Sequence, residues 1–364
     1  MRDLVIPVSK PFLPPLDEVV RHLQRAWDAG VLTNQGPLLT DLERALRTKL
    51  ECPDLVIVAN GTLALHLALR AFDVQGEVIT TPMSFAATAT SVLWEHCVPV
   101  FADVDPDSLN LDPAAARAAM TSKTKAILAT HVYGNPCDVE AFEQLQRETD
   151  CLVMYDAAHA FGVQVNGKSV LTYGDASALS FHATKIFHTG EGGAVALRDA
   201  DRRARVERLR NFGQSAPGVF TELGTNAKLS ELHAALGLAV LAHYDEVSAR
   251  RRAIAESYDT LLGADSSALR RPQWHPGSTR NYAYYPILLS NEARVLAVLE
   301  ALKEKGVLAR RYFYPALSTL PYITSRSCPI AEDAARRALC LPLHTEVTDD
   351  DARQIAGIVL DGAR

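Results

Sequence analysis

Lys185 is the residue whose type and position most directly suggest covalent chemistry. It closes the segment Ser180-Phe181-His182-Ala183-Thr184-Lys185, which follows a strand-like run at 176–179. A lysine in apolar and cationic surroundings has a lowered pKa, as an amine needs if it is to attack a carbonyl carbon and form a Schiff base. A surface lysine in a turn is the simpler interpretation. The spacing of the residues alone does not decide between a surface lysine and a catalytic one.

Asp156 could supply a buried negative charge to the same chemistry. It ends the apolar run 151–155 and opens Ala157-Ala158-His159. A carboxylate at the end of a buried strand needs a partner. Three partners fit: the start of a following helix, a metal ion shared with His159, or the protonated pyridine nitrogen of pyridoxal phosphate (PLP). The last partner is what a PLP ring requires to act as an electron sink.

Asn60-Gly61-Thr62 and Phe85 also follow predicted strands. The first group lies between a strand-like run at 55–58 and an Ala/Leu-rich helix at 63–72. Free N–H groups at a helix start, with a glycine and a hydroxyl, suit a phosphate. Ordinary helix capping uses the same residue types. Phe85 follows the strand at 78–81 and could stack on a planar ring, although core packing is the default for a phenylalanine.

The elements that must position these residues form an alternating pattern. From about 55 to 197, short apolar runs alternate with helical stretches, which predicts an α/β fold with a mostly parallel sheet. Such sheets bind ligands where their strands end. A long helical region at 229–262 leads into a different, mixed pattern. We expect a large domain at 31–240 and a smaller mixed α/β domain at 241–364, with 1–30 packed on the small domain or at a subunit interface.

Composition narrows the class of protein. The 364 residues carry a net charge of −6, which argues against a general nucleic-acid binder. The basic run Arg250-Arg251-Arg252 is expected on a solvated helix face. Six scattered cysteines without a C-x-x-C pair suggest neither a zinc site nor a disulfide framework. No signal peptide and no 18-residue apolar stretch are visible, so we expect a cytoplasmic protein without a membrane span.

Several segments together resemble the DegT/DnrJ/EryC1/StrS family of aminotransferases. These segments are 33–37, 60–65, 155–162, 180–185, 190–193, 209–213, 226–231 and 341–344. The resemblance covers nearly the whole chain. The segments Asp-Ala-Ala-His at 156–159 and Phe-His-Ala-Thr-Lys at 181–185 are most similar to those of the sugar 4-aminotransferases in the family.

The resemblance implies a fold-type-I PLP enzyme that works as a homodimer, with active sites built from both subunits. Lys185 would bind the cofactor as a Schiff base and shuttle the proton, and Asp156 would pair with the pyridine nitrogen. The other implied cofactor contacts are Phe85 on the ring, Gly61, Thr62 and Ser180 at the phosphate, His159 at the phenolic oxygen, and Asn226 at the phosphate of the neighbouring subunit's cofactor. Glutamine is more usual in the family at the position of His159.

The implied reaction moves an amino group from L-glutamate to a keto carbon of a nucleotide-linked sugar. We expect C4 of dTDP-4-keto-6-deoxyglucose, which gives dTDP-4-amino-4,6-dideoxyglucose. Candidate substrate contacts are Asn34, Arg311, Tyr314 and His344. Amination at C3 of a 3-keto sugar and a non-catalytic role as a PLP-binding sensor are the alternatives.

Three rival functions are weaker on the residues. A nicotinamide-dependent oxidoreductase would need G-x-G-x-x-G after the first strand, but segment 60–65 has one glycine. The dehydratases of the same family carry histidine where this chain has Lys185. A calcium loop beginning at Asp103 lacks the required glycine and glutamate, because Ser108 and Ala114 occupy those positions. We therefore expect no metal.

Overall fold

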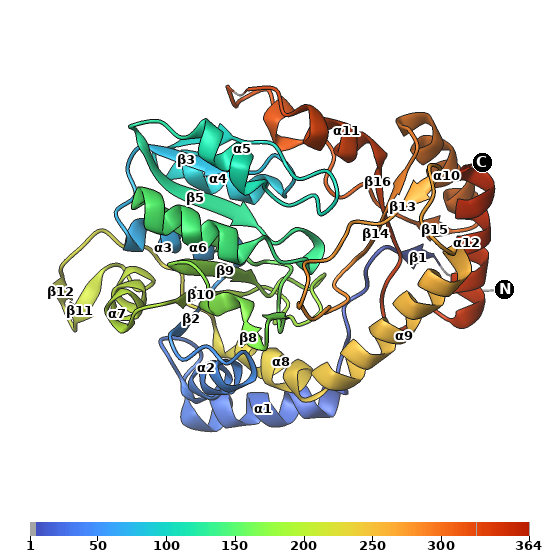
Figure 1. Ribbon diagram of the computed structural model, residues 1–364. Helices are drawn as coiled ribbons and strands as arrows, with labels where there is room; N and C mark the ends of the chain where they lie inside the picture. Colours follow the sequence, from blue (N-terminus) through green and yellow to red (C-terminus); the bar gives the residue numbers. More distant parts are fainter. Residues whose placement is uncertain (1–4, 325, 364) are drawn as a thin grey trace.

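A seven-stranded sheet forms the centre of the large domain in the computed structural model, which describes residues 5–324 and 326–363 (Figure 1). The strand order is β2-β10-β9-β6-β5-β3-β4. Neighbouring strands run parallel, except that β10 is antiparallel to both β2 and β9. The strands are β2 (Leu55–Val58), β3 (Glu77–Thr80), β4 (Val98–Phe101), β5 (Thr124–Thr130), β6 (Leu152–Asp156), β9 (Ala176–Ser180) and β10 (Gly193–Leu197). The predicted, mostly parallel α/β fold is confirmed.

Helices cover both faces of this sheet, which explains why its strands are continuous apolar runs. Successive side chains of a strand point to opposite faces. Leu55 and Ile57 of β2 therefore join one hydrophobic core, whereas Val56 and Val58 join the other. The first core packs against α2 (Pro37–Lys49), α5 (Pro113–Ala119), α6 (Val139–Thr149) and α8 (Glu231–Ala242). The second packs against α3 (Gly61–Ala71), α4 (Ala86–Trp94) and α7 (Ala200–Leu209).

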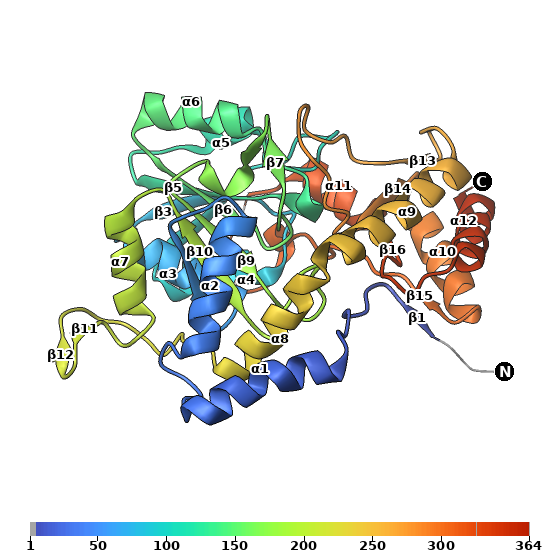
Figure 2. The same cartoon turned by 90° about the horizontal axis from the view of Figure 1, so that it is seen from below.

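The small domain has its own antiparallel sheet and its own core. The sheet contains β13 (Leu269–Arg270), β14 (Tyr285–Leu289) and β16 (Ala338–Leu341). Its helices are α10 (Glu292–Glu304), α11 (Pro329–Arg337) and α12 (Asp349–Ala363). The long α9 (Tyr244–Leu262) runs from one domain into the other (Figure 2). Val247 belongs to the large-domain core and Ile254 to the small-domain core, so the change of core falls inside this helix.

The N-terminal segment contacts both domains. Its strand β1 (Ile6–Pro7) pairs with β15 (Val307–Leu308) of the small domain, and α1 (Leu16–Ala29) packs on α8 and α2. Within one chain, β1 lies on the small domain and α1 on the large one, and the alternative placement of 1–30 at a subunit interface stays a prediction. Residues 1–4 lie outside the described part. The remaining short elements are β7 (Gln164–Val165), β8 (Lys168–Ser169), β11 (Gln214–Ala216), β12 (Val219–Phe220), and the 3-10 turns η1 (Val132–Gly134), η2 (Val170–Thr172) and η3 (Leu317–Thr319).

One surface prediction is wrong. Arg251 was expected on a solvated helix face, but its side chain is buried. Its guanidinium donates hydrogen bonds to the backbone carbonyls of Tyr282 (2.9 Å) and Ala283 (2.6 Å). A run of charges along the sequence cannot show that one side chain turns toward the interior, where backbone carbonyl groups accept its hydrogen bonds.

Two other expectations can be compared with the structure. All six cysteines are buried and free of disulfides. No helix within the described ranges is long and apolar enough to cross a membrane.

Candidate active site

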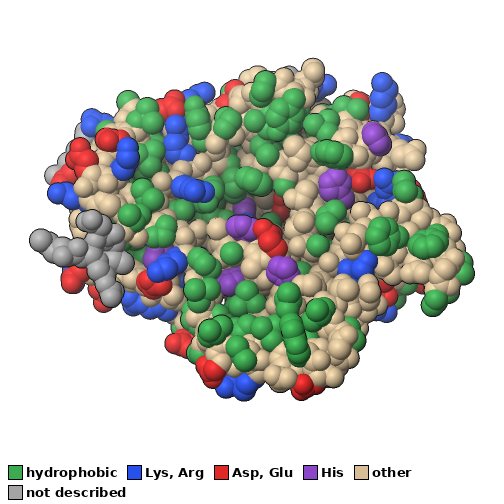
Figure 3. All heavy atoms as spheres, turned by 180° about the vertical axis from the view of Figure 1, so that it is seen from behind, with side chains coloured by type: hydrophobic (Ala, Val, Ile, Leu, Met, Phe, Trp, Pro, Cys, Tyr) green, Lys and Arg blue, Asp and Glu red, His purple; other side chains and the backbone are tan. Residues whose placement is uncertain are grey.

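The predicted cofactor residues meet at one edge of the large sheet. Because β3, β6, β9 and β2 point the same way, the turns that follow them lie at this edge. They open into a cavity of about 790 Å³. Its walls include Gly61, Thr62, Phe85, Asp156, His159, Ser180 and Lys185. Histidine side chains also gather near the middle of the face in Figure 3, and His66, His159 and His182 line this cavity.

The start of α3 forms one corner of the cavity. The side chain of Asn60 caps the helix by accepting a hydrogen bond from the N–H of Leu63 (2.8 Å). A Cβ on Gly61 would lie only 2.8 Å from the Cβ of Ser180, so a glycine is needed where α3 approaches the end of β9. The result is a helix N-terminus beside two hydroxyls, those of Thr62 and Ser180, which suits a phosphate.

Asp156 is a buried carboxylate whose contacts are all neutral. Its Oδ1 accepts a hydrogen bond from the N–H of Ala158 (3.1 Å), and its Oδ2 accepts one from the hydroxyl of Thr88 (2.6 Å). Burial raises the pKa of Asp156 above its ordinary value, and the two hydrogen bonds act in the opposite direction. A cationic ring nitrogen in the cavity would compensate the burial of this charge.

Lys185 lies on the loop that joins β9 to β10. The loop is held by hydrogen bonds from the N–H of Ala183 to the carbonyl of Gly190 (2.8 Å) and from the N–H of Thr189 to the carbonyl of Phe181 (2.9 Å). The Nζ of Lys185 donates to the hydroxyl of Tyr284 at 3.3 Å. Burial lowers the pKa of Lys185 to about 8, although the charge of Asp156 acts to raise it. This amine is therefore suited to nucleophilic attack near neutral pH.

His159 lines the cavity with a buried, neutral ring. Among the described residues, its buried Nδ1 has no hydrogen-bond partner. Its ring stacks on Phe313 at 5.3 Å and meets the edge of Tyr284 at 4.9 Å. Burial lowers the pKa of His159 well below its ordinary value, so the ring is neutral. A neutral imidazole in the cavity wall fits the phenolic oxygen of PLP.

Phe85 completes the fit to the cofactor. It lines the cavity, and 63% of its surface is exposed. An exposed ring beside a cavity is available for stacking on a planar group. The corner at α3, the carboxylate of Asp156, the amine of Lys185 and the neutral ring of His159 together fit the parts of PLP.

Several residues at the site escaped the sequence analysis. Tyr284, Arg310, Tyr312 and Phe313 line the cavity from the small domain. None of them follows a strand of the large sheet, so no strand-end pattern indicates them. Thr88 donates a hydrogen bond to Asp156. It follows Phe85 by three residues at the start of α4, and because residues with this spacing share one face of a helix, the sequence could have indicated it.

Two predicted residues lie away from the cavity on the surface of the single chain. Asn34 is exposed just before α2, and Asn226 is exposed where it bridges Asn211. Neither is among the residues that line the cavity in the described chain. Their predicted roles therefore depend on a second subunit and stay predictions.

The other candidate substrate residues also lie outside the cavity wall. Arg311 pairs with Glu292 at 2.6 Å and stacks over the ring of Tyr314 at 3.5 Å from its centroid. His344 is buried, and neither of its ring nitrogens has a hydrogen-bond partner among the described residues. A direct role for these side chains in one chain would require a substrate that extends beyond the cavity.

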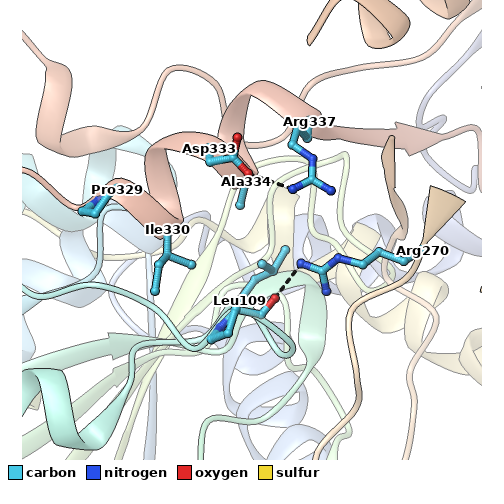
Figure 4. Close-up of a pocket in the computed structure, with 8 residues that line it drawn as sticks. Leu109, Arg270, Pro329, Ile330, Asp333, Ala334 and Arg337 are labelled. Atoms are coloured by element: carbon cyan, nitrogen blue, oxygen red, sulfur yellow. Dashed lines mark hydrogen bonds and ion pairs between the residues drawn. The ribbon is translucent and has the colours of Figure 1, made fainter. Parts of the chain in front are cut away.

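A second cavity, of about 300 Å³, lies between the loop at Leu109 and α11 (Figure 4). Its two arginines both hydrogen-bond to other groups of the protein. Arg270 donates to the carbonyl of Pro106 (2.7 Å), and Arg337 pairs with Asp333 (2.8 Å). This cavity contains no lysine, histidine or cysteine. We therefore place the active site in the larger one.

Comparisons with known proteins agree with this geometry. The DegT/DnrJ/EryC1/StrS aminotransferase family model matches residues 16–360. The chain is 38% identical to a protein of Shigella dysenteriae named dTDP-4-amino-4,6-dideoxy-D-glucose transaminase, with 97% of each chain covered. An Escherichia coli protein of the same name is 37% identical, with 99% of each covered.

A solved structure gives the same answer for the fold. The chain is similar to DesI in the presence of its TDP-sugar product, with a TM-score of 0.92 and 36% sequence identity. The similarity covers 99% of this chain and 93% of that one. The chain therefore belongs to the DegT/DnrJ/EryC1/StrS family of PLP-dependent, fold-type-I aminotransferases.

Proposed function

We propose that the protein transfers the amino group of L-glutamate to C4 of dTDP-4-keto-6-deoxyglucose. The products are 2-oxoglutarate and dTDP-4-amino-4,6-dideoxyglucose. The observation that carries the proposal is the amine of Lys185, with a pKa of about 8, in one cavity with the buried carboxylate of Asp156. The names of the two relatives at 37% and 38% identity support the choice of sugar.

Each side chain has a distinct task in this reaction. When bound, PLP supplies an electron sink that stabilises negative charge at the carbon losing its proton. The Nζ of Lys185 takes the proton from Cα of glutamate and later delivers one to the sugar carbon that receives nitrogen. A base positioned in this way typically contributes about 10²- to 10⁴-fold in rate. The carboxylate of Asp156 holds a proton on the ring nitrogen.

The remaining contacts bind and orient. The N-terminal turn of α3, with Gly61, Thr62 and Ser180, is assigned to the phosphate because these groups lie together in one corner of the cavity. Phe85 is assigned to the face of the ring, and the imidazole of His159 to the phenolic oxygen, because both side chains line the cavity.

The protein is proposed to act as a homodimer whose two subunits share each active site. Asn226 would reach the phosphate of its neighbour's cofactor, and Asn34 would contact the neighbour's substrate. Both are exposed on the single chain. The segment near Asn226 also exposes the apolar side chains of Phe220 (65%) and Leu223 (74%), which supports a partner on this surface. Arg311, Tyr314 and His344 are kept as candidate substrate contacts.

The test of the reaction uses a panel of nucleotide-linked keto-sugars. Purified protein is incubated with PLP, L-glutamate and each sugar, and products are identified by mass spectrometry and NMR. We expect a 4-amino-4,6-dideoxyglucose product and an equal amount of 2-oxoglutarate, both absent with Lys185→Ala. Amination of 3-keto sugars alone would move the site of reaction to C3. PLP binding without turnover on any sugar would favour a sensor.

A mixed dimer tests the sharing of the site. Lys185→Ala and Asn226→Ala chains, each poor alone, are co-expressed, and the heterodimer is isolated. If Asn226 acts in trans, both lesions fall in one site, and the intact second site restores about half of the normal activity per dimer. If it acts in cis, each site carries one lesion and no rescue appears. A fully active monomer would also contradict shared sites.

A further inference from the structure

A chain of three buried hydroxyl groups ends on the carboxylate of Asp156. The hydroxyl of Thr130 donates to that of Ser84 (3.1 Å), Ser84 and Thr88 share a hydrogen bond of 2.7 Å, and Thr88 donates to Oδ2 of Asp156 (2.6 Å). Thr130, Ser84 and Thr88 are each at most 2% exposed. The chain crosses three elements, because Thr130 ends β5, Ser84 follows β3 and Thr88 lies on α4.

The direction of the protons along this chain follows from its end. A hydroxyl has one proton to donate. Since Thr88 gives its proton to the carboxylate, the proton between Ser84 and Thr88 must come from Ser84. Ser84 then accepts from Thr130, so all three O–H dipoles point toward Asp156. If Oδ2 carried a proton along this direction, Thr88 could no longer donate to it, and this hydrogen bond would have to be given up or reversed. The arrangement therefore favours the ionised carboxylate.

This assistance is needed because burial works the other way. Burial raises the pKa of Asp156, and the hydrogen bond from Thr88 is the largest influence that lowers it. The charged or titratable groups that face Asp156 are Lys185, whose charge also lowers this pKa, and the hydroxyl of Tyr284. Without the hydroxyl of Thr88, the carboxyl group would keep its proton to a higher pH.

We propose that Thr88 is a positioning residue that holds Asp156 ionised and oriented, with Ser84 and Thr130 fixing the direction of its hydrogen bond. The inference rests on the proposed function in one respect: an ionised Asp156 matters for turnover only if it faces the ring nitrogen of PLP. Thr88 also lies in the first turn of α4, which begins directly after Phe85. The start of α4 thus positions both the ring of Phe85 and the hydroxyl of Thr88 that donates to Asp156.

The first test uses the cofactor-free protein, in which no catalysis is involved. A carboxyl group whose pKa is raised by folding costs stability as pH rises through that pKa. Thr88→Val raises the pKa of Asp156 further, so as pH rises above the ordinary pKa of an aspartate its midpoint of thermal unfolding should fall more than that of the wild type. Thr88→Ser should behave like the wild type. The control is Thr90→Val on the same helix, whose hydroxyl bonds only to carbonyls within α4.

A second variant keeps the test informative if Thr88→Val does not fold. Ser84→Ala removes the donor to Thr88 but leaves the bond to Asp156, so it should give a smaller shift in the same direction. The same pH dependence in the wild type and in both Thr88→Val and Ser84→Ala would overturn the inference.

The second test uses the enzyme with PLP. Thr88→Val should retain the cofactor but turn over glutamate at least tenfold more slowly, with the loss mainly in kcat, and Thr88→Ser should restore the rate. Wild-type turnover by Thr88→Val would refute the positioning role. A wild-type protein without transamination would refute the proposed function instead, while the cofactor-free titration would still decide whether Thr88 controls Asp156.

Discussion

The amine of Lys185 should react with an aldehyde at a pH where ordinary lysines are almost fully protonated. Burial lowers its pKa from 10.5 to about 8. At pH 7, an amine with that pKa is neutral in about one molecule in ten, against about one in three thousand for an ordinary lysine. If reactivity follows the neutral fraction, Lys185 should exceed a surface lysine by about 300-fold.

The substitution Asp156→Asn tests whether burial is the cause of the lowered pKa of Lys185. The negative charge of Asp156 is the largest influence that raises the pKa of Lys185, whereas burial lowers it. Asparagine keeps the shape of the side chain and removes the charge. The pKa of Lys185 should therefore move further down, below about 8.

The assay measures labelling of Lys185 as a function of pH. Cofactor-free protein is treated with pyridoxal and cyanoborohydride from about pH 5 to pH 11, which spans both pKa values, and the labelled peptide is quantified by mass spectrometry. N-α-acetyllysine corrects for the titration of the reagent, and Lys185→Ala gives the background. Labelling should rise about tenfold per pH unit and level off near pH 8. A rise that continues beyond pH 10, or an upward shift in Asp156→Asn, would refute the reasoning.

Three further predictions concern the surroundings of the site. Tyr284→Phe removes the hydroxyl 3.3 Å from the Nζ of Lys185, so kcat should fall by about tenfold, less than the loss of a positioned acid–base group, because Tyr284 orients Lys185 and does not itself transfer the proton; unchanged steady-state kinetics would exclude a role. Gly61→Ala places a Cβ 2.8 Å from Ser180, so the Kd for PLP, measured by fluorescence titration, should rise at least about tenfold; wild-type affinity would contradict the phosphate corner. Arg251→Met leaves the carbonyls of residues 282 and 283 unpaired, so the free energy of unfolding in urea should fall by about 1–3 kcal/mol. If Arg252→Met, at the exposed neighbouring position, lowered the free energy of unfolding equally, the loss of the two hydrogen bonds would not be the cause.

Much of the fold could be predicted because local patterns carry it. A strand covered on both faces must be apolar throughout, and the run Leu55-Val56-Ile57-Val58 appears as β2 at the same residues. Helix starts were also readable, since Asn60 caps α3 as the turn before an Ala/Leu-rich stretch suggests. The long helical region at 229–262 proved to be two helices that meet at His243, a break that helical composition alone does not indicate.

Residues at strand ends could be gathered into one site for a topological reason. Parallel strands bring their carboxyl ends to the same edge, so Asp156 and Ser180 had to lie near each other once the sheet was recognised as parallel. Lys185 follows the second of these strands, on the loop that returns to β10. The sequence by itself thus determined the identity of the chemical groups and the edge of the sheet on which they meet.

Only the tertiary structure decided what surrounds those groups. Tyr284 reaches Lys185 from the small domain, and this contact depends on how two domains pack about 100 residues apart in the chain. Burial, which sets the direction of the pKa shifts of Lys185 and Asp156, is a property of the assembled fold and not of any segment. The hydroxyl chain ending at Thr88 likewise joins three elements. Short-range patterns specify which side chains are present, whereas desolvation and directional hydrogen bonds arise when distant elements enclose them.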